Sequence, residues 1–446
     1  MNYVLLSILS LSMATISAYS CWRDVSRGQC GWGFAMRAAF FCTVLAPQTA
    51  LYALLPHMDL QAPGIYGFVA EALACDLATH LRLTLLTLLC WSGMEIAYRS
   101  AMPNVRWKLR SADPGDLRAS HAERVVLAAC WLMAVLSVAV LAAHTQSSSL
   151  IELPGEVAVN LRMNWNATDR GFLPAIAFSI LGALACQAGF GMFAGARPRF
   201  MQRIVATCIG LPALAAAGSR RAFIIPVVVS LLTSLSHRGV RTAVSLGILI
   251  GLLLATVIPF GRSALRMTAG QDASIRSEIG SDSLVDQCGY VAVELSISQI
   301  ESLSTMWRYE GPPLLGIDHW TALARLVVKE SVFGIRLPRV TRQMTEMHTG
   351  DPEMNDVPAG FVGAAWADAG WLGFLFLPVM LGSVAAVFDR WAMSRRWTEG
   401  GTYCCFAAGY LLFFQTMNTG TLDYTLAPES ILVVGLCAYA MSRMPR

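Results

Sequence analysis

The chain has 446 residues, of which 55% are hydrophobic and only 14% are charged, and its mean hydropathy is +0.53. A soluble protein would carry nearer a quarter of charged residues, so these values exclude an ordinary soluble fold and favour an all-α polytopic membrane protein. The net charge of +4 is small and no nucleic-acid-binding motif occurs, so we expect no nucleic-acid partner.

The apolar residues fall into runs that predict about eleven membrane helices, since about 20 apolar residues span a bilayer. The first run lacks a basic N-terminal region and a clear cleavage pattern, so we expect a retained helix and not a signal peptide. The two runs that flank Gly218 are short for a membrane span. In chain order the predicted helices are Asn2–Ser20, Phe34–Leu55, Leu77–Tyr98, Val125–His144, Phe172–Ala194, Ile204–Gly218, Phe223–Ser236, Thr242–Phe260, Gly360–Phe388, Thr402–Met417 and Pro428–Met441.

These helices divide the chain into three regions. Residues 1–260 hold the first eight predicted helices, residues 261–359 form one large loop, and residues 360–446 hold the last three. Basic residues gather in alternate short connections, which by the positive-inside rule places the N-terminus in the periplasm and the C-terminus in the cytoplasm. The large loop then lies in the periplasm of a bacterial inner-membrane protein, and long loops are exempt from the rule.

The large loop is rich in cations. Its Leu, Val, Ile, Trp and Phe residues recur at helical intervals, which indicates that it folds onto the membrane surface and is not disordered. Cations on this face suit an anionic substrate, although contact with lipid headgroups is an alternative role. The nine cations of the loop are Arg262, Arg266, Arg276, Arg308, Arg325, Lys329, Arg336, Arg339 and Arg342.

Two pairs of arginines lie at predicted membrane edges. Arg220 and Arg221 follow a Gly-Ser turn between two apolar runs, and Arg262 and Arg266 come directly after the eighth predicted helix. On a continuing helix the second pair shares one face, where two cations repel each other unless an anion lies between them. Guanidinium groups bind phosphate in a bidentate manner, so both pairs predict a diphosphate site, with headgroup contact as the alternative.

Candidate acid–base residues are few in this region. The loop holds His319 and His348, and the pKa of an imidazole lies in the range useful to a general base. Asp368 lies within the ninth predicted helix, where a carboxylate either pairs with an arginine or lines a polar cavity. No Cys/His spacing or Asp-x-Asp motif indicates a metal site, so we expect no metal or cofactor. Rival bases are the carboxylates Asp318, Glu294 and Glu301.

Four features, in this order along the chain, carry a resemblance to a known family. They are the Gly-Ser-Arg turn ending at Arg220, the arginine-bearing start of the large loop, Leu337-Pro338-Arg339 late in the loop, and Ala369-Gly-Trp-Leu-Gly373. From about Leu211 to Gly382 the chain resembles bacterial oligosaccharide repeat-unit polymerases of the Wzy type, which are related to O-antigen ligases. Such polymerases often have more helices than are predicted here, and the lysine that often follows the Pro-Arg element is absent.

The resemblance implies a GT-C-like membrane glycosyltransferase that acts at the periplasmic face without a metal. It would move a growing glycan from undecaprenyl diphosphate onto the non-reducing end of another lipid-linked repeat unit. Expected partners are the undecaprenyl-diphosphate-linked oligosaccharide, membrane lipids and a chain-length regulator, and the loop is expected to be a lid on the diphosphate site. The implied diphosphate ligands are Arg220, Arg221, Arg262, Arg266 and Arg339, the supporting residues are Arg336 and Asp368, and the candidate bases are His319 and Asp318.

Three other functions remain open at this point. An O-antigen ligase would use the same chemistry with lipid A core as acceptor, and a non-enzymatic assembly subunit would leave the outer arginines dispensable. A transporter or flippase for an anionic lipid or solute predicts charges within the spans, broken helices and repeated halves. No repeat is visible, and charges placed in or near the spans are few, among them Arg82, Glu71, Asp76 and Asp368.

Overall fold

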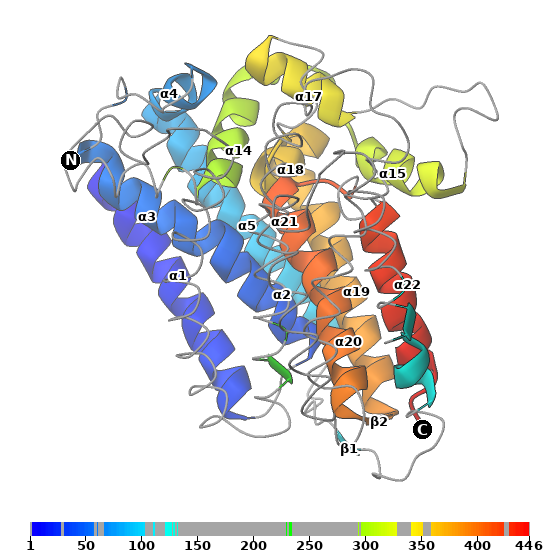
Figure 1. The fold of residues 1–446 in the computed structure, drawn as a ribbon. Helices are drawn as coiled ribbons and strands as arrows, with labels where there is room; N and C mark the ends of the chain where they lie inside the picture. Colours follow the sequence, from blue (N-terminus) through cyan, green and yellow to red (C-terminus); the bar gives the residue numbers. More distant parts are fainter. Residues whose placement is uncertain are drawn as a thin grey trace, which may run out of the picture. The chain divides into compact units, whose positions relative to one another are not determined.

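The computed structural model describes a mostly helical protein (Figure 1). The chain divides into two compact units, which are Met1–Trp107, Ile275–Trp391 and Leu411–Leu426 for the first and Lys108–Ser274, Ala392–Tyr410 and Ala427–Arg446 for the second. The structure describes residues 2–27, 31–57, 60, 67–102, 110–111, 121–126, 128–129, 132, 229, 232–233, 293, 296–327, 340–350, 358–422 and 428–445.

The first unit begins with apolar helices that match the first three predicted spans. The second of them is continuous from Trp32 to His57, although its middle winds as a π-helix. Asp76 caps the third, since its carboxylate accepts hydrogen bonds from the backbone N–H and the hydroxyl of Thr79. The elements are α1 (Asn2–Ser26), α2 (Trp32–Phe40), η1 (Phe41–Leu45), α3 (Ala46–Leu54), η2 (Leu55–His57), α4 (Gly67–Leu73) and α5 (Leu77–Ala101).

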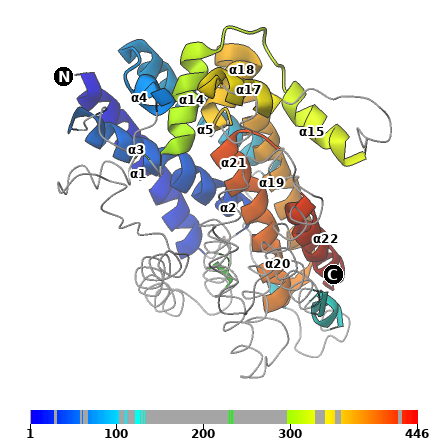
Figure 2. The same cartoon turned by 45° about the horizontal axis from the view of Figure 1, so that its top comes forward.

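The large loop contributes three described helices to the same unit, namely α14 (Ile297–Arg308), α15 (Ile317–Val327) and α17 (Val340–Thr349). Helix α14 packs against α4, α5 and α18, and α17 lies across its end (Figures 1 and 2). The prediction that the loop folds onto the membrane surface is therefore wrong for α14, which is buried among the other helices. The hydroxyls of Ser302 and Thr305 donate to backbone carbonyls four residues earlier in the same helix. Because such hydroxyls are hydrogen-bonded within the helix, α14 can be buried despite its polar residues.

The ninth predicted helix, Gly360–Phe388, is wrong as one continuous span. The structure divides it into α18 (Phe361–Ala369), the 3-10 helix η4 (Gly370–Leu375) and α19 (Leu377–Met393), and the two halves meet at 54°. Gly370 has a positive φ of +59°, which ends α18. Pro378 is the second residue of the next helix, in the first turn, where a missing N–H costs nothing. Gly373 then lies against the carbonyl of Ala365 so closely that no Cβ would fit.

The remaining elements close the chain. The tenth predicted span becomes three elements, and the last predicted span becomes one helix. In the second unit α20 packs against α22, and β1 pairs in parallel with β2. The bounds are β1 (Arg110–Ser111), β2 (Arg396–Trp397), α20 (Glu399–Tyr410), η5 (Leu411–Gln415), α21 (Thr416–Thr419) and α22 (Pro428–Ser442).

Membrane character is visible in the described part of the chain. Tyr3–Ser26 and Trp32–His57 are long and apolar enough to cross a membrane, and the bent pair Phe361–Leu375 and Leu377–Met393 would make a third span. Most of the predicted spans between Val125 and Phe260 lie outside the described residues.

Candidate functional site

The structure brings His319 and Asp368 together at the break of the bent span. Asp368 is the second-last residue of α18 and His319 lies in the first turn of α15; 1% and 5% of their surfaces are exposed. His319 Nε2 lies 3.6 Å from Asp368 Oδ2, which is an ion-pair distance but too long for a hydrogen bond. Among the described residues Asp368 Oδ2 has no hydrogen bond. Its ion-pair partner is an imidazole, whereas the two predicted alternatives were an arginine partner and a polar cavity.

A strained turn holds the two side chains in place. Leu315 and Gly316 both have left-handed backbone conformations, with φ of 49° and 73°, and the former is costly for a branched side chain. The turn directs the Gly316 N–H onto Asp368 Oδ1 at 2.7 Å and the Leu315 N–H onto the Asp368 carbonyl at 3.0 Å. Strain of this kind persists only where surrounding contacts fix it, and here two of those contacts are made to Asp368.

Tyr309 lies outside the span, and the charge of Asp368 affects its pKa. Burial raises the pKa of the Tyr309 phenol, and the negative charge of Asp368 raises it further. The phenol itself donates to the Pro312 carbonyl at 2.6 Å, within the segment that leads into the strained turn. The raised pKa keeps the phenol protonated, so it remains a hydrogen-bond donor to the segment before the turn.

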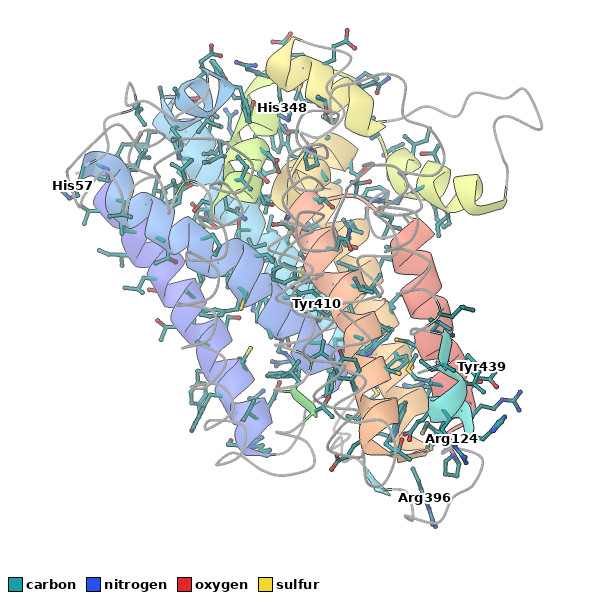
Figure 3. The ribbon with its side chains drawn as sticks, in the orientation of Figure 1. His57, Arg124, His348, Arg396, Tyr410 and Tyr439 are labelled. Atoms are coloured by element: carbon teal, nitrogen blue, oxygen red, sulfur yellow. The ribbon has the colours of Figure 1, made fainter. Side chains whose placement is uncertain are left out.

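His348, the other loop histidine, lies in a different setting. It is buried where α17 meets α14, as Figure 3 shows, with Nδ1 2.7 Å from the Ser304 hydroxyl and Nε2 3.3 Å from the Thr305 hydroxyl. Burial lowers the pKa of His348 to about 4, and the nearby Arg308 guanidinium lowers it as well. A group so weakly basic and so fully bonded is suited to structure and not to general-base catalysis.

Arg308 joins three helices and is not the plain surface cation that its place in the loop suggests. Its guanidinium on α14 donates to the carbonyls of Met347 and His348 at the end of α17, at 3.1 and 2.9 Å. It also forms an ion pair with Glu71 of α4. Capping of these C-terminal carbonyls fixes α17 over the bundle.

A second cluster of charges, missed by the sequence reasoning, lies among α1, α2 and α5. The Arg37 guanidinium donates to Glu95 from Nε at 2.5 Å and to Asp24 at 2.6 Å, and its carbon lies 4.9 Å from the centre of the Tyr98 ring. Arg99 adds a bond to Glu95 at 3.0 Å. Asp24, Arg37 and Glu95 lie near the predicted inner ends of three consecutive antiparallel spans. Opposite charges at the same predicted depth in the membrane were the signal available in the sequence.

Asp389 of α19 forms a further buried anchor beside this cluster. Its carboxylate accepts from the N–H groups of Trp32 and Gly33, at 2.6 and 2.9 Å, and from the Tyr98 hydroxyl at 2.8 Å. It therefore caps the N-terminus of α2, where exposed N–H groups and the helix dipole favour a negative charge.

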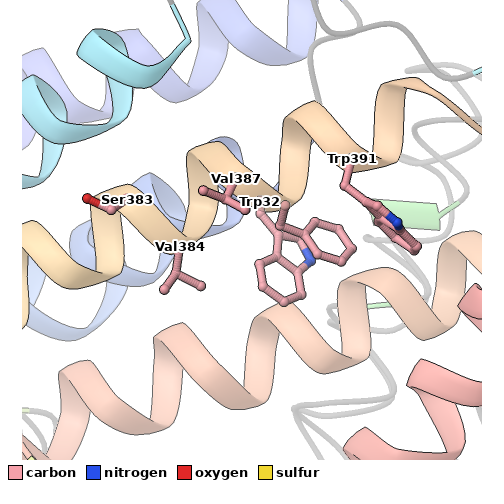
Figure 4. Close-up of a pocket in the computed structure, with 6 residues that line it drawn as sticks. Trp32, Ser383, Val384, Val387 and Trp391 are labelled. Atoms are coloured by element: carbon pink, nitrogen blue, oxygen red, sulfur yellow. The ribbon is translucent and has the colours of Figure 1, made fainter.

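An apolar cavity of about 450 Å³ lies next to this anchor, along α19 (Figure 4). The Trp32 ring stacks on Phe388 with centroids 3.6 Å apart, and the remaining lining residues are Ser383, Val384, Val387 and Trp391. Its lining offers no charged group, so it is not the site of the predicted diphosphate chemistry.

Several predicted site residues fall outside the part of the chain that the structure describes. They are Arg220, Arg221, Arg262, Arg266, Arg336 and Arg339, together with the side chain of Asp318. The predicted diphosphate site therefore stays a prediction. Glu301, a rival base, is described and lies buried on α14.

The pair formed by His319 and Asp368 can accept and hold a proton. A carboxylate that faces an imidazole orients the ring and stabilises its protonated form, as in other acid–base pairs. No group of three or more potential metal-binding side chains occurs among the described residues. A scan against protein-family models finds no match, and searches of curated proteins and of solved structures find none either.

Proposed function

We propose that the protein is a membrane glycosyltransferase that polymerises undecaprenyl-diphosphate-linked oligosaccharide repeat units into a surface polysaccharide. The observation that carries the proposal is the buried pair of His319 and Asp368 at the break of a membrane span, where the arginine-rich loop meets that span. The sequence resemblance to Wzy-type polymerases supports the same reaction.

In the proposed reaction the acceptor sugar hydroxyl attacks the anomeric carbon of the donor glycan. The new glycosidic C–O bond forms as the bond from that carbon to the diphosphate oxygen breaks, and undecaprenyl diphosphate leaves with the electron pair. The hydroxyl proton passes to His319, whose imidazolium is stabilised by Asp368. Arg220 and Arg262, with Arg221, Arg266 and Arg339, neutralise the charge that develops on the leaving diphosphate.

The proposal is tested by complementing a strain that lacks the gene. Arg220→Ala, Arg262→Ala and His319→Gln variants, each expressed at the normal level, are expected to abolish long polymer on a gel. His348→Gln is the matched histidine control, because His348 is held by hydroxyls and takes no part in the proposed transfer. Persistence of long polymer in the arginine and His319 variants would refute the proposed roles.

The same gel separates polymerase from ligase. Loss of the ladder with a single attached repeat retained is expected for a polymerase. Complete loss of attached glycan would identify an O-antigen ligase, which transfers the finished glycan to lipid A core.

A transporter is the second candidate, and two observations favour it. The bent span of α18 and α19 is a broken helix of the kind that transporters use around a substrate, and Arg37, Glu95 and Asp24 are buried charges within or beside spans. In purified protein reconstituted into vesicles, glycosyl transfer from a lipid-diphosphate donor would exclude transport as the sole activity. Movement of the donor across the bilayer without transfer would establish it.

A further inference from the structure

Helix α15 is amphipathic, but its exposed face is apolar, which is the opposite of a helix on the surface of a soluble protein. Its exposed face consists of Ile317, Trp320 and Leu323, spaced three residues apart, and Trp320 is 68% exposed. Its opposite face carries His319 and Ala322, which are buried in the unit. The polar histidine thus points inward and the largest apolar side chain points outward, so the outer surroundings of this helix are apolar.

Apolar side chains are also exposed at the break of the candidate membrane span and in the turn before α15. Trp371, Leu372 and Leu375 of η4 are all exposed, as is Leu315 in the strained turn. The residues that flank the two elements are in contact. Leu315, before α15, donates its N–H to the carbonyl of Asp368, two residues before η4, and a Cβ at Gly316 would lie 3.4 Å from the ring of Phe376, which follows η4. We call this set of exposed apolar residues the apolar platform; its members are Leu315, Ile317, Trp320, Leu323, Trp371, Leu372 and Leu375.

Lipid is the occupant that the apolar platform fits. None of its members is charged, and it contains two tryptophans, the side chain that gathers where hydrocarbon meets headgroups. Its members Trp371, Leu372 and Leu375 belong to one half of a candidate membrane span, Phe361–Leu375, which would face lipid if the bent pair crosses the membrane. An amphipathic helix with such a face lies in the plane of the interface.

We propose that α15 and η4 lie in the lipid–water interface, with Trp320 and Trp371 at the level of the headgroups and the aliphatic residues of the apolar platform against the acyl chains. His319, on the inner face of α15, is thereby held at the depth of the headgroups, where the reactive diphosphate of any lipid-linked substrate also lies. The embedding of the platform is independent of the proposed glycosyl transfer, and its failure would leave that function untouched.

The test is photocrosslinking of the full-length protein in nanodiscs of phosphatidylethanolamine and phosphatidylglycerol, and in native membranes. A benzoylphenylalanine replaces Trp320 in one variant and Trp307 in the other. Trp307 is the matched control because it is also an exposed loop tryptophan, at 45%, but it stands beside Arg308 with the guanidinium 5.4 Å from its ring. Mass spectrometry is expected to find phospholipid adducts at position 320 and none at position 307.

Fluorescence gives a second measurement that does not depend on crosslinking chemistry. Brominated phospholipids are expected to quench part of the tryptophan emission, and Trp320→Phe is expected to remove much of that quenched part while Trp307→Phe leaves it. A crosslink from position 320 to another protein chain would overturn the proposal in favour of a protein interface. Equal lipid adducts at both positions, or none at position 320 with unchanged quenching in Trp320→Phe, would also overturn it.

Discussion

The cluster around Arg37 and the pair of His319 and Asp368 both bury carboxylates among apolar helices of the same unit. In the Arg37 cluster each oxygen of Glu95 accepts from a guanidinium, and Asp24 pairs with two arginines. At the other site one oxygen of Asp368 accepts a backbone N–H, and the other lies 3.6 Å from an imidazole and has no hydrogen bond within the described part of the chain.

The difference separates two uses of buried charge. A fully paired carboxylate has no capacity left for a proton or a ligand, and it fixes the packing of the helices that contribute to it. A carboxylate with a loosely held oxygen keeps that capacity, at the cost of an incompletely compensated charge. We therefore expect variants in the first cluster to change stability and variants at the second site to change activity.

The largest effect is expected from Asp368→Asn. The amide oxygen still accepts the Gly316 N–H, so the thermal midpoint should change little, but the imidazolium of His319 loses its counter-charge. Loss of general-base assistance costs about 10²–10⁴-fold in rate, and initial rates of glycan transfer by purified protein measure it. The control is Asp389→Asn, which should lower the thermal midpoint and leave the rate per folded protein unchanged. If Asp368→Asn transferred glycan at the wild-type rate, Asp368 would have no role in activity and the proposed difference between the two sites would be wrong.

Next in size is the destabilisation expected from Arg37→Met. The change leaves Glu95 and Asp24 as buried charges without their main partner, which costs about 3–5 kcal/mol. Arg99→Met is the matched control, because 63% of the Arg99 side chain is exposed and such a pair contributes about 0–1 kcal/mol. Denaturation in detergent measures the free energy of unfolding of both variants. Equal losses of stability would show that the burial of Arg37 does not make its ion pairs stronger than that of Arg99.

His348 sharpens the comparison through pH. Its pKa is lowered to about 4 in the folded protein from an ordinary value near 6.5, so the unfolded chain binds the proton more readily. Stability should therefore be complete above about pH 6.5 and fall as the pH drops toward 4, by about 3 kcal/mol at most. Arg308 and its partner Glu71 are the charged groups nearby, and an early loss of the Glu71 pair would add to the decline. Acid denaturation of wild type and His348→Gln tests this, since only the wild type should show this histidine-dependent loss.

The smallest effects are expected from two glycines with similar conformations. Gly316→Ala and Gly350→Ala each place a Cβ on a residue with φ near 70°, which costs about 1 kcal/mol. Only Gly316 donates to Asp368, so its alanine variant should also slow transfer by shifting that N–H, while Gly350→Ala should not. Identical rates in the two variants would mean that the turn does not position Asp368.

The sequence predicted the helical class and the approximate limits of several spans, because length and apolarity are local properties. It did not predict the break near Gly370, since the break depends on loop residues that bond to the end of α18. Nor did it predict the burial of α14, because the apolar residues at helical intervals in the loop indicated a helix on the membrane surface. The polar residues of α14 tolerate burial because hydroxyls such as those of Ser302 and Thr305 bond along their own helix.

The residues of the candidate site could be predicted from the sequence, but the contact between them could not. His319 and Asp368 were each singled out by residue type and position, yet an imidazole as the partner of Asp368 requires tertiary contacts that no spacing encodes. Arg37 was not singled out, because its partners Asp24 and Glu95 come from two other helices. The choice between His319 and His348 also needed the fold, because burial and hydroxyl partners distinguish them.

The bonds between the turn and the bent span limit how this protein can be recombined with others. The carbonyls of Ala367 and Asp368 receive N–H groups from Leu314 and Leu315 in place of the helical donors they would have in an unbroken span. The large loop is thus no detachable module, because a graft that ends at residue 359 would leave these two carbonyls without the donors they have here. Chimaeras should therefore exchange the segments 311–327 and 358–378 together.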